Sequence, residues 1–190
     1  MAFLIPAASS SEGKSVIFLS NFLSPLGRIT LTSDGTALIG LAFEQEAHPR
    51  DRSTAIAQSH PILLDAERQL HEYLGNWRKS FDVPLRPEGT PFQQEVWRQL
   101  CQIPFGQTIS YLELAKQIGK EKAVRAVGMA NGRNPISILI PCHRVIGANG
   151  KLTGYGGGLW RKEFLLQHEG ALNTLGQRAL FENQPSTATG

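Results

Sequence analysis

A group of reactive residues lies inside an apolar segment in the second half of the chain. Residues 136–146 read Ile-Ser-Ile-Leu-Ile-Pro-Cys-His-Arg-Val-Ile. Adjacent residues on an extended strand point to opposite faces, so His143 can act on Cys142 only if the backbone turns there or a water molecule bridges them. Pro141 removes a backbone donor and favours a departure from regular strand. We therefore expect an irregular turn that carries reactive groups.

Cys142 is the candidate nucleophile. A cysteine reacts as the thiolate, which needs a nearby base or cation, and here His143 and Arg144 are its neighbours. The alternative is a buried structural cysteine, because free cysteines are among the most buried residues. Cys101 lies in an apolar context and fits that alternative well, whereas Cys142 fits it poorly.

Glu169 is the candidate for the group that would hold a catalytic histidine. It lies at the expected C-terminus of the last helix, where the helix dipole disfavours a carboxylate. A carboxylate that accepts a hydrogen bond from a histidine N–H fixes its tautomer and raises its basicity. On these grounds His143 and His168 are both possible partners, and a solvated helix end is the alternative explanation for Glu169.

The first half of the chain carries the pattern of a small sheet. Runs rich in β-branched and aromatic residues predict strands at 16–22, 26–32 and 37–43, and the Asp-Gly pair at 34–35 predicts a tight hairpin between the last two. A further short strand is expected at 81–85. These runs together indicate a small antiparallel sheet.

A helix is expected to pack on this sheet. Pro61 can occupy its first turn. Its apolar stripe consists of Leu63, Ala66, Leu70, Leu74 and Trp77. The polar segment 86–89, which contains Pro and Gly, marks a domain boundary.

Two capping boxes predict helix starts in the second half. Thr90 pairs with Gln93, and Ser110 pairs with Glu113. A further helix is expected at about 122–130. The last two of these helices are short and joined by a tight turn, which resembles a helix-turn-helix.

Arg125 lies among small residues in the second helix of this pair. Ala126 and Gly128 would let the helix approach another surface closely while the long cation of Arg125 reaches into a groove. The alternative is that the small residues pack helices together and Arg125 is a solvated charge. DNA binding is therefore one of two open explanations at this point.

The last part of the chain combines turns with one helix. Asn149-Gly150 predicts a hairpin turn, the glycine-rich residues 154–158 predict a flexible loop, and a final helix is expected at 159–168 with Gly170 as its stop. Residues from 173 onward lose their periodicity.

These elements define the fold class as α+β. A small N-terminal antiparallel sheet with a helix is followed by a mainly helical C-terminal domain with a winged-helix-like helix-turn-helix. We expect domains at 1–88 and 89–172 and a flexible tail at 173–190. Residues 1–88 hold 8 Lys and Arg against 10 Asp and Glu, whereas residues 89–190 hold 11 against 6. The basic second half is the candidate binder of a polyanion, with a merely solubilising surface as the alternative.

The cysteine count excludes several classes of protein. Two cysteines 41 positions apart make neither a disulfide framework nor a four-thiolate zinc site. No run approaches the roughly 20 apolar residues that a bilayer span needs. We expect a reduced, cytoplasmic protein without membrane contact.

Five motifs of the second half occur in an order that resembles the O6-alkylguanine-DNA alkyltransferases (methylated-DNA–protein-cysteine methyltransferases). They are Arg125-Ala-Val-Gly128, Asn134-Pro135, Pro141-Cys-His-Arg-Val145, Tyr155-Gly-Gly-Gly-Leu159 and His168-Glu-Gly170. The resemblance is dense from about Phe92 to Gly170 and only topological before that. It implies a DNA repair protein that flips O6-alkylguanine out of duplex DNA and moves the alkyl group irreversibly onto its own cysteine, with O4-alkylthymine as a second candidate lesion.

The resemblance also assigns roles to residues. By their place in the motifs, Cys142 is implied as the acceptor, and His143, acting through a water, and Glu169 as the relay that forms its thiolate. Asn134 is implied as the hinge asparagine that supports the site. The implied substrate pocket consists of Tyr155, Gly156 and Gly157. The implied DNA-binding residues are Arg125, Tyr111, Ala126 and Asn131. Among them the arginine fills the gap left in the base stack and the tyrosine helps to rotate the neighbouring phosphate.

The implied partner is double-stranded DNA that carries O6-alkylguanine, bound by a monomer without a cofactor. Some relatives have a cysteine-rich zinc site near the N-terminus, but no cysteine precedes Cys101 here, so we expect no metal. Alkyltransferase-like proteins that bind lesions without repair have tryptophan at the reactive position, and Cys142 argues against that group. Two alternatives from other classes stay open: a cysteine hydrolase that uses Cys142 and His143, and a lesion-sensing DNA-binding module without chemistry.

Overall fold

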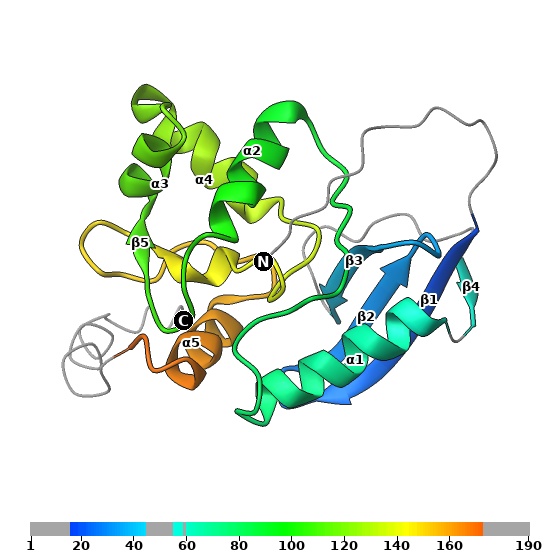
Figure 1. Cartoon of the computed structure of the whole chain (residues 1–190). Coiled ribbons are helices and arrows are strands. Elements are labelled where there is room, and N and C mark those ends of the chain that lie inside the picture. The colour runs from blue at the N-terminus through cyan, green and yellow to red at the C-terminus, as the bar shows by residue number, and fades with distance from the viewer. Residues whose placement is uncertain (1–15, 45–54, 59, 173–190) are drawn as a thin grey trace, which may run out of the picture.

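The computed structural model describes residues 16–44, 55–58 and 60–172. Figure 1 shows a twisted sheet with one helix against it, followed by a group of helices and short strands. We call the first, which holds the described residues up to 88, the N-terminal part. We call the second, residues 89–172, the C-terminal part. The expected tail at 173–190 lies outside the described residues. The α+β arrangement is as expected.

The sheet of the N-terminal part has the strand order β3-β2-β1-β4. Strands β1 (Ile17–Ser24), β2 (Gly27–Ser33) and β3 (Leu38–Phe43) are antiparallel neighbours, as predicted. Strand β4 (Ala55–Ala57) runs parallel to β1 and had no signal in the sequence. The segment expected as a strand at 81–85 forms only an isolated bridge from Leu85 to Leu38.

Helix α1 (Pro61–Leu74) packs on β1 and β2. Its apolar stripe is buried at Leu63, Ala66 and Leu70, as expected. The assignment of Trp77 to that stripe was wrong, because its side chain is 86% exposed. The helix ends at Leu74, three residues earlier, and Asn76 adopts a φ of 65° that no longer continues it.

The C-terminal part begins with the predicted helices. Both capping boxes are formed, at the starts of α2 (Pro91–Leu100) and α3 (Tyr111–Gln117). A 3-10 turn, η1 (Glu121–Ala123), leads into α4 (Val124–Gly132), which packs on α2 and α3. The predicted pair of short helices is therefore present as α3 and α4.

The reactive segment is a 3-10 turn, η2 (Cys142–Arg144), rather than a strand. It runs into the short strand β6 (Val145–Ile146), which pairs in parallel with β5 (Ile109–Ser110). The expected hairpin at Asn149-Gly150 is a turn that joins no pair of strands among the described residues. Helix α5 (Leu159–His168) is as predicted, and Gly170 follows it with a φ of 68°.

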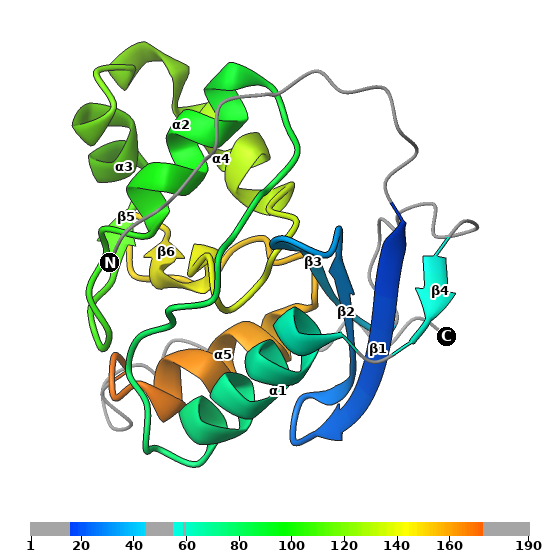
Figure 2. The same ribbon diagram turned by 45° about the vertical axis from the view of Figure 1, so that its right-hand side comes forward.

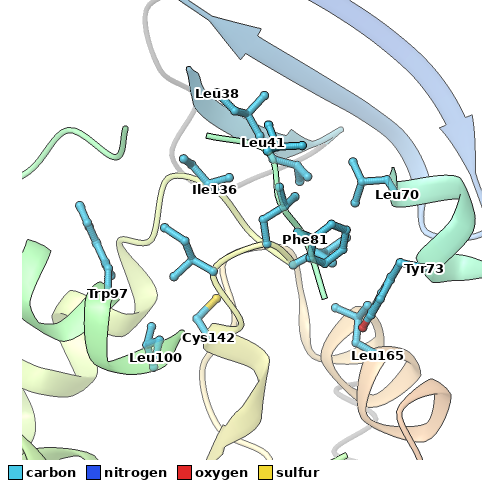
Figure 3. Close-up of a cluster of buried hydrophobic side chains, with 14 of the residues drawn as sticks. Leu38, Leu41, Leu70, Tyr73, Phe81, Trp97, Leu100, Ile136, Cys142 and Leu165 are labelled. Atoms are coloured by element: carbon cyan, nitrogen blue, oxygen red, sulfur yellow. The ribbon is translucent and has the colours of Figure 1, made fainter. Parts of the chain in front are cut away.

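One hydrophobic core joins the two parts. Figure 3 shows Leu41 and Leu70 of the N-terminal part in the same buried cluster as Leu100 and Cys142. The backbones also meet, since the N–H of Leu41 donates to the carbonyl of Pro135 at 2.9 Å. Figure 2 shows α5 beside α1, below the other helices of the C-terminal part. None of the described helices is long and apolar enough to cross a membrane.

Candidate active site

The thiol of Cys142 lies inside the protein, at the start of the reactive turn. Its residue is only 4% exposed, and the Asn134 side chain donates from Nδ2 to its Sγ at 3.0 Å. The same Nδ2 donates to the carbonyl of Ile140 at 2.8 Å. A donor to sulfur favours the thiolate over the thiol, because it stabilises the charged form. Asn134 therefore ties the residues just after α4 to the reactive atom.

His143 is fully buried and its Nε2 lies 3.0 Å from Oε1 of Glu169. Burial, the largest influence, lowers the pKa of His143 from its ordinary value, so the imidazole is neutral near pH 7. Because the Glu169 carboxylate can only accept a hydrogen bond, Nε2 of His143 carries the proton and donates it. Nδ1 is therefore the basic nitrogen of the neutral ring. Nδ1 is buried and has no hydrogen-bond partner among the described residues, which leaves it able to take a proton.

The choice between the two histidines is therefore settled in favour of His143. His168, the other possible partner of Glu169, instead places its Nε2 2.7 Å from the carbonyl oxygen of Tyr73. The backbone turns at Cys142–Arg144, as expected, and the side chain of His143 reaches Glu169.

The Glu169 carboxylate collects hydrogen bonds from four residues. Oε1 accepts from His143, from Nη2 of Arg144 at 2.8 Å and from the hydroxyl of Tyr73 at 2.7 Å. Oε2 accepts from Nε of Arg144 at 2.8 Å and from the backbone N–H of Gly106 at 3.2 Å. Burial acts to raise the pKa of Glu169, but the hydrogen bonds from His143 and Arg144 outweigh it and hold that pKa well below its ordinary value. Glu169 is therefore a fixed anion that orients His143.

Two cations are buried around this group. Arg144 is 7% exposed and also donates from Nη1 to the carbonyl of Ile103 at 2.6 Å. Lys162 of α5 is fully buried, and its Nζ donates to the carbonyls of Val145 at 2.6 Å and Thr153 at 2.8 Å. Burial lowers the pKa of Lys162 to about 8. Both cations oppose protonation of the nearby imidazole.

The glycine-rich loop before α5 is held against the N-terminal part. A Cβ added to Gly157 would lie 2.6 Å from the ring of Phe43, so only glycine fits there. Arg161 donates to the carbonyls of Gly157 at 2.5 Å and Leu26 at 2.7 Å, and its guanidinium lies 4.8 Å from the centre of the Phe43 ring. Tyr155, also expected in the pocket, has its ring centre 6.4 Å from that of Phe43. An added Cβ on Gly156, by contrast, would meet only the carbonyl of Gly132, at 3.7 Å.

The residues expected at the DNA surface separate into two groups. Arg125 and Ala126 are exposed on α4, and Met129, which the sequence reasoning did not select, is 58% exposed on the same helix. Tyr111 is partly buried at the start of α3 and its hydroxyl lies 3.3 Å from the carbonyl of Thr153. Asn131 is only 1% exposed, and its Nδ2 donates to the carbonyl of Cys142 at 3.3 Å. Asn131 thus lies with the reactive turn rather than beside Arg125.

Two family models match the chain. The 6-O-methylguanine DNA methyltransferase, ribonuclease-like domain, matches residues 17–87, and the 6-O-methylguanine DNA methyltransferase, DNA binding domain, matches residues 91–171. A methylated-DNA–protein-cysteine methyltransferase of Methanosarcina acetivorans is 49% identical over 155 residues, which cover 82% of this chain and 99% of that relative. The chain belongs to this methyltransferase family.

Further relatives support the same conclusion. A methylated-DNA–protein-cysteine methyltransferase of Mycobacterium tuberculosis is 49% identical over 146 residues, or 77% of this chain and 88% of that relative. The crystal structure of Mycobacterium tuberculosis OGT in complex with DNA matches this structure with a TM-score of 0.76 and 45% identity, over 81% of this chain and 93% of that one. The methyltransferase fold therefore extends over both parts of the chain.

Several residues of the candidate site carried no signal in the sequence. Tyr73 and Gly106 donate to Glu169 from positions 96 and 63 residues earlier, and Arg161 donates to the carbonyl of Leu26 across 135 residues, so spacing could not reveal these contacts. Arg144 is next to the reactive pair, and its position was the one available signal.

Cys101, expected to be structural, is partly buried, and burial raises the pKa of its thiol to about 12. In the described ranges, no group of three or more His, Cys, Asp or Glu is placed to hold a metal ion.

Proposed function

We propose that this protein repairs DNA by moving an alkyl group from O6 of guanine in a duplex onto Sγ of Cys142. The observation that carries the proposal is the buried arrangement in which Asn134 donates to Sγ while Glu169 holds the neutral imidazole of His143. A nucleophile, a base and the group that orients the base are thus present, as covalent catalysis requires. Membership of the methyltransferase family supports the same reaction.

The proposed transfer leaves atoms and electrons balanced. His143 takes the thiol proton of Cys142 at Nδ1, through a water molecule, and the thiolate attacks the alkyl carbon. The S–C bond forms as the C–O6 bond breaks, and the electron pair of the broken bond goes to the guanine. The proton held by His143 then passes to the guanine. The products are a thioether on Cys142 and an unmodified base. A thioether does not leave again under these conditions, so each molecule acts once.

The α3 and α4 pair is proposed to bind the duplex. Arg125 and Ala126 face solvent on α4, where small residues permit close approach to a groove and a long cation can fill the space of a flipped base. The minor groove carries little sequence information, which suits repair at any sequence. We propose Tyr111 for the phosphate beside the flipped nucleotide, and Tyr155, Gly156 and Gly157 for the base pocket.

Asn131 and Asn134 are proposed to connect the binding surface to the chemistry. Both follow the exposed face of α4 in sequence, and they donate to the carbonyl and the Sγ of Cys142 respectively. Because Asn131 is buried, we propose a positioning role for it rather than the direct DNA contact expected from the resemblance. Action as a monomer, a cytoplasmic location and a domain boundary at residues 88 and 89 stay predictions.

Mass spectrometry after incubation with a duplex that contains O6-methylguanine tests the proposal. We expect one methyl group per protein molecule, on Cys142, with guanine restored in the DNA. Cys142→Ser should bind the duplex and transfer nothing, whereas Cys101→Ser, the matched control, should react like the unaltered protein. Repeated turnover without a modified protein would indicate a hydrolase. Lesion binding without any transfer would indicate a sensing module, and a methyl group on Cys101 would also contradict the proposal.

A further inference from the structure

Tyr73 links the N-terminal part to the proposed relay. It lies on α1, its side chain is fully buried, and its hydroxyl donates to Oε1 of Glu169 at 2.7 Å from a position 96 residues earlier in the chain. Figure 3 shows Tyr73 pointing toward α5 from the end of α1, next to Leu165. Building on the function proposed above, we infer that Tyr73 is a positioning residue of alkyl transfer, which holds Glu169 and tunes how strongly Glu169 attracts a proton on His143.

The inference rests first on which oxygen Tyr73 reaches. Oε1 of Glu169 is the same atom that faces Nε2 of His143 at 3.0 Å, and it also accepts from Arg144. Donors to one oxygen share its electron density, so each weakens the acceptance offered to the others. Removal of the Tyr73 hydroxyl therefore leaves more negative charge for His143 and raises its proton affinity.

The position of Tyr73 is fixed from several sides. Its ring packs against Phe81, Phe105 and His168, with ring centres 5.3, 6.1 and 5.0 Å away. Its carbonyl oxygen is 2.7 Å from Nε2 of His168, the residue before Glu169. Burial, followed by the nearby Glu169 carboxylate, raises the pKa of Tyr73 well above its ordinary value. Tyr73 is therefore a hydrogen-bond donor, not a source of protons, at neutral pH.

The groups around His143 determine the direction of the effect. Glu169 favours the protonated imidazole, whereas Arg144 of the same turn, Lys162 of α5 and burial itself oppose it. Cys142 directly precedes His143 in the sequence. Tyr73 of α1 does not contact the imidazole itself but acts on it through Glu169. Arg144 and Lys162 are unaltered when only the hydroxyl of Tyr73 is removed. A change in the proton affinity of His143 would then report the charge on Glu169.

The test is the pH dependence of Cys142 alkylation in Tyr73→Phe, measured between about pH 5 and about pH 8.5 with iodoacetamide and with free O6-benzylguanine. The rate should fall at the acidic end of the pH–rate profile, and we call this falling part the acid limb. In Tyr73→Phe we expect the acid limb to shift to higher pH by about 0.5 to 1 unit, which is a roughly 3- to 10-fold loss of rate at a given acidic pH, relative to the plateau. Ser33→Ala is the matched control. It also removes a buried hydroxyl of the N-terminal part, one that donates to the carbonyl of Ala37 at 2.8 Å, and should leave the limb in place.

A substitution that keeps the hydroxyl gives the opposite expectation. Tyr73→3-fluorotyrosine has a more acidic hydroxyl and is a stronger donor, so its acid limb should move down. An unmoved limb in both variants, with only a lower melting temperature in Tyr73→Phe, would mean that Tyr73 serves packing alone and would overturn the inference. Iodoacetamide needs no alkylguanine, so a shifted limb in a protein that cannot repair DNA would reject only the proposed function. Normal repair with an unmoved limb would reject only the role of Tyr73.

Discussion

The polar and charged side chains around the reactive turn are buried, whereas those on the outer face of α4 are exposed. His143, Arg144 and the carboxylate of Glu169 are buried, and each is held by hydrogen bonds to other residues. Arg125 and Ala126 of α4 are exposed, and Met129 is 58% exposed. The groups proposed for the chemistry are thus held in place by the interior, whereas those proposed to contact DNA are exposed.

This difference defines two kinds of variant. Loss of a group around the reactive turn should slow the reaction with every substrate, because the nucleophile itself is altered. Loss of a group on the exposed face of α4 should slow only the reaction with duplex DNA, because the free base needs no flipping. A comparison of duplex O6-methylguanine with free O6-benzylguanine therefore separates the two regions.

Glu169→Gln should have the largest effect. The amide cannot balance the buried guanidinium of Arg144 and no longer stabilises a protonated His143, so we expect transfer to fall about 100-fold or more on both substrates. Removal of one partner of a buried ion pair also costs about 3 to 5 kcal/mol in the free energy of unfolding. Single-turnover rates and urea unfolding measure the two quantities.

Glu163→Gln is the matched control on the same helix, because Glu163 is only partly buried and pairs with Gln167 within α5. It should change neither rate nor stability by more than a small amount. If Glu169→Gln slowed the duplex reaction alone, the buried network would not be acting on the thiol, and the separation of the two regions would fail.

Arg125→Ala should have the next largest effect, and only on the duplex. Arg125 is exposed on α4, and we expect its loss to lower the rate with duplex O6-methylguanine about 10-fold or more while the rate with the free base is unchanged. Arg28→Ala, an exposed arginine of β2, is the control for the loss of one positive charge. Equal losses on both substrates would contradict a role of Arg125 in base flipping.

The sequence predicted those parts of the fold that depend on nearby residues. The capping boxes at Thr90 and Ser110 formed as expected, because each needs only residues three positions apart. Trp77 was assigned wrongly, since an apolar periodicity continues past the point where Gly75 and Asn76 end the helix. Strand β4 had no signal because a three-residue strand depends on its pairing with β1.

The candidate site followed the same division. Cys142 and His143 are neighbours, and Glu169 lies at an unfavourable helix end, so local reasoning singled out all three as candidates. The contacts of Tyr73 and Gly106 with Glu169 join residues 96 and 63 positions apart. Tyr73 itself lies among the buried residues of α1, where an apolar pattern gives no reason to expect a polar role. The contact of Tyr73 with Glu169 exists only because the two parts of the chain share one core.

The smallest expected effect is a loss of stability at mildly acid pH. It tests whether the reactive turn, unlike the exposed face of α4, is shielded from solvent in the folded protein. Burial lowers the pKa of His143 from about 6.5, so the unfolded chain binds a proton before the folded chain does, and the free energy of unfolding falls as the pH drops below that value. Glu169 acts in the same direction at lower pH, because its depressed pKa gives stability that is fully present above about 4.5 and lost as the pH falls toward the folded value.

We therefore expect the unaltered protein to become less stable between about pH 6.5 and about pH 5.5, by no more than the roughly 1.4 kcal/mol per pH unit that the binding of one proton allows. His143→Gln has no imidazole to protonate and should lose much less over this interval, although it is less stable throughout. His71→Gln is the control, because His71 of α1 has a side chain that is 55% exposed. Urea unfolding at the two pH values measures each loss. An equal loss in His143→Gln and the unaltered protein would show that the titrating group lies elsewhere, and that water or protons reach His143 as freely as they reach the exposed face of α4.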